Sequence, residues 1–331
     1  MKPRAEHKRK HHFVPKLYLK GFIEAEQSPF VWVYERGMPY NPGHKRHHNP
    51  CRRAITLVGA EEDHYAFKEK DGTINFDAYE SELEKLEKPS NPIFAKLRRH
   101  NMLTSQEKED FASYVLLMYK RVPRRKERFR SSWPHVSGSV LSEIAQWLDL
   151  EEARTDKSDE ARFARISELR RELEEARRHY EENIPVNTGI PLQSLVMESP
   201  LGIPTMLSSM TWQFLIAPEG YGFLASDDPV FPAGLDKPYS EISFPISEDI
   251  ALVMSWYDLD QGFFETTPEV VDEINLRTAN RALRQVYYSK AEKWGVDTME
   301  ENREGYYLIY PFWKLQLTNW YDRYMDKNFN V

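Results

Sequence analysis

The strongest constraint on the fold is a change in hydrophobic period close to Pro185. Between Asp77 and Glu182, apolar residues recur mainly at helical spacing. After Pro185, aromatic and β-branched residues fall in short runs separated by Gly and Pro, which is typical of strands. The runs are TWQFLIAP (211–218), YGFLAS (221–226), EISFPIS (241–247) and IALVMSW (250–256). Helices followed by strands predict an α+β fold, with a mixed or mainly antiparallel sheet built largely from the C-terminal third.

The central helical region carries clear start and stop signals. Thr104 and Glu107 have the spacing of a capping box, which predicts that a helix begins after Thr104. Pro123 falls inside the apolar pattern that follows, so we expect a kink or a restart there. Later in the chain, 267–289 has helical spacing and predicts one helix, whereas 306–313 predicts a last strand.

Residues 136–183 predict an antiparallel helical hairpin that projects from the body. The helical pattern breaks near Glu151–Asp159, and apolar residues such as Ile166 and Leu173 recur at heptad-like intervals among charges. The segment holds too few heptads to predict a dimeric coiled coil. We interpret it as an insertion in a single α+β domain (1–331), and as a surface for a protein partner or for self-association.

Shorter elements precede the helices. Residues 31–37 (VWVYERG) alternate and carry Val and aromatic side chains, which predicts a strand. Residues 63–76 predict two short strands joined at Asp71-Gly72, a strong hairpin signal. Three glutamates at helical spacing follow, and we expect them to form a solvated face: Glu80, Glu84 and Glu87.

Charge is spread unevenly along the chain. Residues 1–53 contain twelve Lys and Arg against four Asp and Glu, whereas the whole chain has a net charge of −7. A basic end on an acidic body can attract phosphate without a general affinity for DNA, although an ordinary solvated surface explains it equally well. The one cysteine, Cys51, excludes an internal disulfide framework and is typical of a reducing cytoplasm. No apolar run approaches the roughly 18 residues that span a bilayer, so we expect a cytoplasmic protein without membrane partners.

The first candidate site is the histidine pair His11-His12, which lies in a basic run. Adjacent histidines share one site only in irregular backbone, and the nearby Pro15 would permit that. A surrounding of Lys and Arg disfavours the imidazolium ion, so each ring is suited to act as a neutral base or a metal ligand. The alternative is a surface pair that anchors the N-terminal arm.

Two further candidates combine cations and carboxylates. The segment YKRVPRRKERFR (119–130) places Arg121, Arg124 and Arg125 after a buried helical stripe, and their guanidinium groups have the geometry that grips phosphate. The turn SDDP (226–229) places carboxylates at the end of an apolar strand, where metals or general bases are often held. A solvated helix end and an ordinary turn are the respective alternatives.

These motifs, in this order, resemble the bacterial DUF4238 family over nearly the whole chain. The opening motif is the most specific, and its matched positions are His11, His12, Pro15, Leu19 and Phe22. The central motif is matched loosely by Arg121 and Pro123, since Lys126 stands where the pattern has a second Arg. The turn motif is matched by Ser226, Asp227 and Pro229. The resemblance implies that the polar motif residues meet in one pocket: His11, His12, Arg121 and Asp227.

From these observations we predict hydrolysis of a phosphodiester in RNA or DNA, in the setting of a stress or phage-defence effector. The predicted catalytic residues are His11, His12, Arg121 and Asp227. The predicted substrate-binding residues are Lys16, Arg124, Arg125 and Ser226. A divalent metal is one expected cofactor, with His11 and Asp227 as candidate ligands.

Two non-enzymatic hypotheses stand beside this one. In the first, the His, Arg and Asp motif residues form a buried polar network that locks the N-terminal arm onto the sheet. In the second, the basic arm and 119–130 bind nucleic acid without strong sequence preference. Burial separates a site from a lock, because a site needs an opening to solvent.

Overall fold

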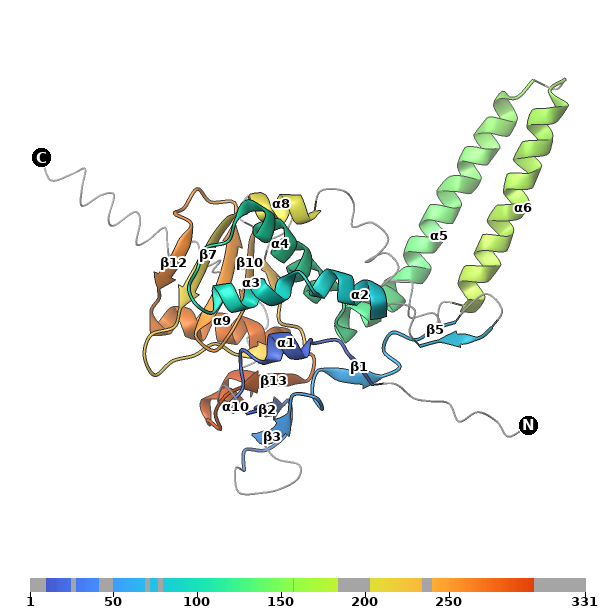
Figure 1. The fold of residues 1–331 in the computed structure, drawn as a ribbon. Coiled ribbons are helices and arrows are strands. Elements are labelled where there is room, and N and C mark those ends of the chain that lie inside the picture. Colours follow the sequence, from blue (N-terminus) through green and yellow to red (C-terminus); the bar gives the residue numbers. More distant parts are fainter. Residues whose placement is uncertain are drawn as a thin grey trace, which may run out of the picture.

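The structure, a computed structural model, describes residues 10–24, 28–41, 50–68, 72–76, 80–156, 158–183, 203–233 and 240–300. The helices are α1 (Lys16–Leu19), α2 (Glu80–Glu87), α3 (Ser90–Leu97), α4 (Ser105–Lys120), α5 (Pro123–Arg154), α6 (Glu160–Asn183), α8 (Ile203–Ser209), α9 (Pro268–Arg281) and α10 (Trp294–Glu300). The strands are β1 (Lys10–His12), β2 (Phe30–Glu35), β3 (Cys51–Ala54), β4 (Ala60–Glu62), β5 (Phe67–Lys68), β6 (Ile74–Asn75), β7 (Thr211–Ile216), β8 (Ala225–Ser226), β9 (Phe231–Ala233), β10 (Glu241–Pro245), β11 (Ile250–Ser255), β12 (Gly262–Glu265) and β13 (Gln285–Tyr288). The α+β prediction is confirmed, with open, mainly antiparallel sheets (Figure 1).

A five-stranded sheet with the order β12-β7-β11-β10-β9 lies at the centre of the body. Its pairs are antiparallel except β12 with β7, which run parallel. Every residue of β11 is buried, because both faces of the sheet are covered. Phe214 and Leu252 belong to the large core that includes α3 and α4. Their neighbours Leu215 and Val253 pack with Ile274 of α9 on the other face.

A second sheet has four strands in the order β3-β2-β13-β8, so it pairs strands from the N-terminal part of the chain with strands from the C-terminal part. The expectation of a single helix over 267–289 is wrong, because α9 ends at Arg281 and β13 follows. Ala282 adopts an extended ψ of 134°, which ends the helix, and the run Gln285–Tyr288 then pairs with β2 and β8. Aromatic and β-branched side chains favour a strand here, and the edge of β2 supplies its hydrogen-bond partners. Of the predicted strand 221–226, only Ala225–Ser226 is a strand.

The two long helices α5 and α6 project from the body as an antiparallel hairpin (Figure 1). Pro123 is the first residue of α5, so the predicted restart is confirmed, and the helix is continuous from there rather than from Val136. The hairpin turns between Arg154 and Glu160, where the sequence pattern breaks. Leu141, Leu148, Ile166 and Leu173 form its own apolar seam.

The N-terminal arm is held to the body by β1, which pairs antiparallel with β4. The carbonyl of Gly59 then accepts hydrogen bonds from the amides of Phe13 and Val14, both at 2.9 Å. Gly59 has a φ of +59°, and a Cβ there would lie 2.6 Å from the Cβ of Val14. Only glycine meets both demands, so this position fixes how the opening motif enters the core.

The remaining expectations can be compared with the structure briefly. The predicted strand near 31–37 corresponds to β2, and the hairpin within 63–76 to β5 paired with β6. Thr104 and Glu107 make both hydrogen bonds of the capping box. The strand predicted for 306–313 lies outside the described residues. Among the helices that the structure describes, none is both long enough and apolar enough to cross a membrane.

Candidate functional site

The histidine pair lies in strand β1, not in the irregular backbone that a shared site would need. Strand geometry sends the two rings to opposite faces, so His11 is 2% exposed whereas His12 is only partly buried. Nδ1 of His11 accepts a hydrogen bond from the amide of Tyr65 at 3.1 Å, and the two rings stack at 5.3 Å. His11 is therefore part of the packing, while His12 faces the surface.

Arg121, at the C-terminal end of α4, is 4% exposed. Its Nε donates to the hydroxyl of Tyr65 at 2.9 Å, its Nη2 to the carbonyl of His12 at 2.6 Å, and its Nη1 to the carboxylate of Glu87. Burial lowers the pKa of Arg121, but Tyr65 and Glu87 outweigh it and hold the pKa above the ordinary value. The guanidinium is thus permanently charged, and each of its nitrogens has a protein partner.

His64 ties this arginine to the loop that follows β4. Its Nε2 lies 2.9 Å from the carbonyl oxygen of Arg121, and its Nδ1 lies 3.0 Å from the carboxylate of Glu61. Burial lowers the pKa of His64, although both oxygen partners favour the protonated ring. Lys126 donates to the carbonyl of His64 at 3.0 Å and so fixes the first turn of α5 to the same loop. We call His11, His12, His64, Tyr65, Glu87 and Arg121 the N-terminal network.

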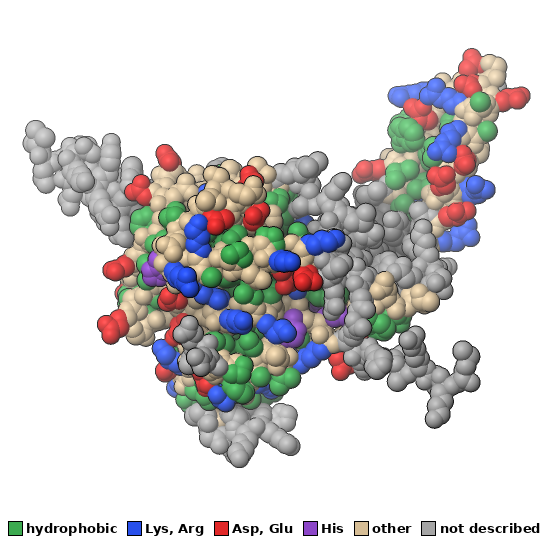
Figure 2. Space-filling view, viewed as in Figure 1, with side chains coloured by type: hydrophobic (Ala, Val, Ile, Leu, Met, Phe, Trp, Pro, Cys, Tyr) green, Lys and Arg blue, Asp and Glu red, His purple; other side chains and the backbone are tan. Residues whose placement is uncertain are grey.

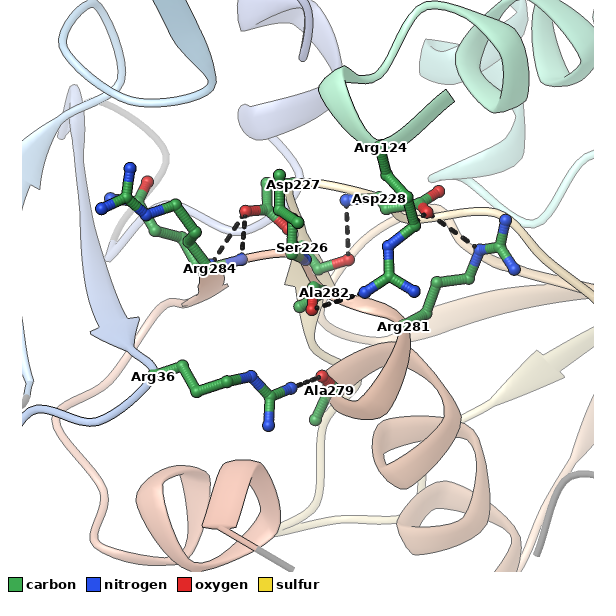
Figure 3. A network of polar contacts seen from close by, with 11 residues as sticks. Arg36, Arg124, Ser226, Asp227, Asp228, Ala279, Arg281, Ala282 and Arg284 are labelled. Carbon is green, nitrogen blue, oxygen red and sulfur yellow. Dashed lines mark hydrogen bonds and ion pairs between the residues drawn. The ribbon is translucent and has the colours of Figure 1, made fainter. Parts of the chain in front are cut away.

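Asp227 follows β8 and is 5% exposed. Its carboxylate accepts three backbone hydrogen bonds, from the amides of Leu283 and Arg284 at 2.7 Å each and of Gln285 at 2.9 Å (Figure 3). Burial raises the pKa of Asp227 to about 6, against the effect of these amides. The side chain closes the turn between α9 and β13, which is a structural task.

The structure therefore brings three of the four predicted catalytic residues into one hydrogen-bonded network: His11, His12 and Arg121. Asp227 uses its oxygens elsewhere. The two regions lie near each other nonetheless. The backbone amide of Arg284 donates to Asp227. The hydrogen bond with His64 lowers the pKa of Glu61 most, and the charges of Lys126 and Arg284 lower it further. Among the rings of the N-terminal network, that of His12 is the least buried, although its Nε2 atom is buried.

The predicted substrate-binding arginines surround Asp228, which is fully buried. Nε of Arg281 lies 3.2 Å from its Oδ2 and Nε of Arg124 lies 3.8 Å away (Figure 3). Arg124 also donates to the carbonyl of Ala282 at 3.3 Å. Arg125 lowers the pKa of Asp228 together with these two, against the larger effect of burial, which raises it. We call Arg124, Arg125 and Arg281 the arginine cluster.

Ser226 shapes the turn beneath this cluster and is fully buried. Its Oγ accepts a hydrogen bond from the amide of Asp228 at 3.2 Å. In Figure 3 the carboxylates of Asp227 and Asp228 point apart, the first toward Arg284 and the second toward Arg281. Ser226 thus has a turn-forming role in the described structure, and its predicted role in binding substrate stays a prediction.

His12 has an unusual combination of partners. Its Nε2 is buried at the atomic level and has no hydrogen-bond partner among the described residues. The ring is hydrogen-bonded to the backbone of Thr56, which must then involve Nδ1. Burial, followed by the charge of Lys16, lowers the pKa of His12. At neutral pH the ring is thus uncharged, with its lone pair on Nε2.

Exposed cations extend from this histidine along one face of the body. Lys10, Lys16, Lys20 and Arg99 are all exposed, and we call them the basic row. The end of α3 lies against α1, since Arg98 donates to the carbonyls of Leu17 and Tyr18 at 3.3 Å each. In Figure 2, blue side chains cross the face over α1. The predicted substrate-binding residue Lys16 is therefore at the surface.

A divalent metal stays a prediction. Within the described ranges, no three His, Cys, Asp or Glu side chains are grouped so that they could hold a metal ion. The two candidate ligands from the sequence, His11 and Asp227, have separate hydrogen-bond partners.

Several residues of these networks were missed or misread in the sequence. Glu87 is not part of a solvated face but binds Arg121, and its side chain is 28% exposed. No sequence pattern indicated Tyr65 or His64, because a loop residue that contacts the end of a helix follows no hydrophobic period. Arg281 is a helical residue far from the SDDP turn, and only the bend after α9 brings it to Asp228.

Comparison with known proteins identifies a family for this chain. A family model described as "Protein of unknown function (DUF4238)" matches residues 10–292, which include every motif discussed above. No curated protein and no solved structure matches the chain.

Proposed function

The chain belongs to the DUF4238 family, a membership that carries no activity, and we propose from its own geometry that it binds nucleic acid without strong sequence preference. In this proposal the polar motifs are not the binding surface. Arg121 and Asp227 hold the N-terminal arm and the α9–β13 turn in place. The basic row contacts the phosphate backbone.

The observation that carries the proposal is the contrast in exposure between these two sets of cations. Arg121 is 4% exposed and has Tyr65, Glu87 and His12 as partners. A phosphate could reach it only by displacing a carboxylate and a carbonyl, which leaves buried acceptors unpaired. Lys16 and Lys20 are exposed on α1 and need no such exchange.

The geometry of the basic row supports a polyanion rather than a small anion. The row extends from β1 over α1 to the residues that follow α3, so its charges are spread over three elements, in a part of the face where Figure 2 shows blue side chains. Charges that are spread over a surface can contact several phosphates of one strand. Binding of this kind is dominated by release of counterions and falls steeply with salt.

The experiment is a salt titration of binding to a labelled single-stranded RNA and a labelled DNA duplex, followed by fluorescence anisotropy. The variant Lys16→Gln/Lys20→Gln should bind about tenfold more weakly at low salt, and the slope of log K against log salt should fall by roughly 1.5. The matched control is Arg171→Gln/Arg178→Gln, which removes two exposed charges from α6. Equal losses in both variants would contradict the proposal.

A phosphodiesterase is the second candidate function, and His12 favours it. Its neutral ring carries an unpartnered lone pair at Nε2 within reach of the charges of Lys10, Lys16 and Arg121. In such a reaction the site would first open, because Nε2 is buried in the described structure. Nε2 would then accept the proton of the attacking water or hydroxyl group as its oxygen bonds to phosphorus. The bond from phosphorus to the leaving oxygen would break, that oxygen would take a proton from solvent, and the lysines would stabilise the charge that develops on phosphate.

The test of this second candidate is cleavage of mixed RNA and DNA in Mg²⁺, Mn²⁺, Zn²⁺ or EDTA. His12→Ala should lose cleavage, whereas His100→Ala, which alters a ring with 41% exposure in the turn that follows α3, should retain it. Both variants are first shown to unfold at the same urea concentration as the wild type. Absence of wild-type cleavage in all four conditions would leave binding as the function.

A further inference from the structure

We propose that the outer face of α5 is the surface through which two copies of this chain associate, as an antiparallel pair of helices related by a two-fold axis. The face is formed by Glu143, Trp147, Leu150 and Arg154, with Ile144 beside them, and we call these five residues the outer stripe. The inference concerns the projecting hairpin, so it goes beyond the proposed function and does not depend on it.

The first argument is the exposure of large apolar side chains on the outer stripe. Ile144 is 40% exposed, Trp147 53% and Leu150 54%. Single exposed apolar residues are ordinary on a protein surface, but three within two turns of one helix form a patch. Removing such side chains from water stabilises an interface, and tryptophan is among the residues that most often anchor one.

The outer stripe faces away from the helix that pairs with α5 inside the hairpin. The hairpin's own seam packs Leu141 and Leu148 of α5 against Ile166 and Leu173 of α6. At 3.6 residues per turn, the outer stripe is centred roughly 140° around α5 from that seam. Figure 1 shows the hairpin projecting from the body, and Figure 2 shows hydrophobic side chains on it among the charged ones. The side chains that hold the hairpin together are thus different from those of the stripe.

The second argument is the spacing of the stripe, which is that of a coiled-coil seam. Glu143, Trp147, Leu150 and Arg154 follow one another at intervals of four, three and four residues. This is the heptad alternation of a and d positions, which places all four on one face of a helix. With a two-fold axis midway between Trp147 and Leu150, Trp147 faces Leu150 of the second copy, and Glu143 faces Arg154 of the second copy.

The third argument is charge complementarity, which selects a second copy as the occupant and sets its direction. In the antiparallel arrangement, the carboxylate of Glu143 lies opposite the guanidinium of Arg154 at each end, so two ion pairs flank the apolar centre. A parallel arrangement would place Glu143 against Glu143 and Arg154 against Arg154, which like-charge repulsion disfavours. The stripe is thus complementary to itself, as a two-fold interface requires.

The two charged residues of the stripe can form these pairs without disturbing the hairpin. Glu143 is exposed, and the side chain of Arg154 is 72% exposed, with Glu151 of the same helix 3.9 Å away. In the described structure, the ion pairs that join α5 to α6 use Asp149, Glu151 and Glu152 on one side and Arg162 and Arg170 on the other. Pairing with a second copy therefore leaves these cross-helix contacts in place.

The length of the stripe sets the expected strength of association. From Glu143 to Arg154 it spans about 17 Å of helix, or roughly three turns. The area that two such stripes bury is at the small end for protein interfaces. We therefore expect a reversible dimer with a dissociation constant of roughly 10–100 µM.

The experiment measures the mass of the full chain, free of nucleic acid, by sedimentation equilibrium at concentrations up to about 0.5 mM. The wild type should pass from monomer to dimer. Trp147→Ser/Leu150→Ser should remain a monomer and keep its stability in urea, because both side chains are exposed. A wild type that stays monomeric would overturn the proposal and leave the stripe to a different protein. A dimer that persists in the double variant would overturn it as well.

A charge exchange tests the antiparallel register. Glu143→Arg and Arg154→Glu should each weaken the dimer about tenfold, because each creates two like-charge contacts. The double variant Glu143→Arg/Arg154→Glu restores opposite charges and should dimerise like the wild type. Its matched control is Glu143→Arg/Arg171→Glu, which has the same net charge but places the new carboxylate on α6, outside the stripe, and should stay weak. Recovery in both double variants, or in neither, would contradict the proposed pairing.

Discussion

The N-terminal network and the arginine cluster both pair arginine with a carboxylate, yet they differ in how far the arginine is buried. In the network, Arg121 has a carboxylate, a hydroxyl and a carbonyl as acceptors. In the cluster, Arg281 and Arg124 lie 3.2 and 3.8 Å from the buried carboxylate of Asp228, and their side chains are 11% and 27% exposed. A buried cation whose donors are all bonded rigidifies a fold, whereas a cation that stays partly exposed can still be reached from solvent. Position in a polar motif therefore does not tell which arginine binds a ligand.

The largest expected effect comes from removing the buried arginine of the N-terminal network. Arg121→Gln removes a buried charge and leaves Glu87, the Tyr65 hydroxyl and the His12 carbonyl without their donor. We expect the free energy of unfolding in urea to fall by about 3 kcal/mol. Arg171→Gln, at an exposed position of α6, should change it by less than about 0.5 kcal/mol. A wild-type midpoint for Arg121→Gln would remove the network's structural role.

Asp227→Asn should have a smaller but clear effect. The amide group of Asn would face backbone amides that now donate to a carboxylate, so at least one donor loses its acceptor. The expected loss is about 2 kcal/mol in the free energy of unfolding. Hydrogen exchange should show the loosening first at Leu283 and Arg284, and unchanged exchange there would contradict the assignment of this carboxylate to the turn.

Both of these residues were singled out in the sequence, where a buried polar network that locks the N-terminal arm stood as one hypothesis beside a catalytic site, and the sequence alone did not decide between the two. The helical periods, the capping box, the hairpin turn and the restart at Pro123 are local signals, and they predicted the corresponding elements well. Whether a polar side chain faces solvent depends on distant partners. The β1–β4 pairing turns His11 inward, and the end of α9 at Arg281 creates both β13 and the contact with Asp228. The spacing of residues in a single sequence does not encode such contacts between distant parts of the chain.

The pH dependence of stability sharpens the account of Asp227. Burial raises its pKa to about 6, whereas an unfolded Asp titrates near 3.9, so the folded state binds this proton more tightly. The group's contribution to stability is then largest at low pH and is lost as the pH rises through about 6. Relative to Asp227→Asn, the wild type should gain roughly 1 kcal/mol between pH 7 and pH 5. The opposite trend would mean that the three amides outweigh burial.

The smallest expected effect is spectroscopic. Burial and the charge of Lys16 lower the pKa of His12, so its ring should titrate below the ordinary value of about 6.5 in an NMR pH series. Lys16→Gln should move that pKa upward without altering the fold, because Lys16 is exposed. If the pKa of His12 is the same in Lys16→Gln as in the wild type, the ring does not lie near the basic row.

The most direct test of the whole account measures two properties of two variants side by side: the free energy of unfolding and the affinity for single-stranded RNA at low salt. We predict that Arg121→Gln loses stability but, at a temperature where it is folded, binds RNA like the wild type. We predict that Lys16→Gln/Lys20→Gln keeps its stability and loses about tenfold in affinity. An Arg121→Gln protein of wild-type stability that no longer binds or cleaves RNA would contradict the account, because Arg121 would then belong to the functional site.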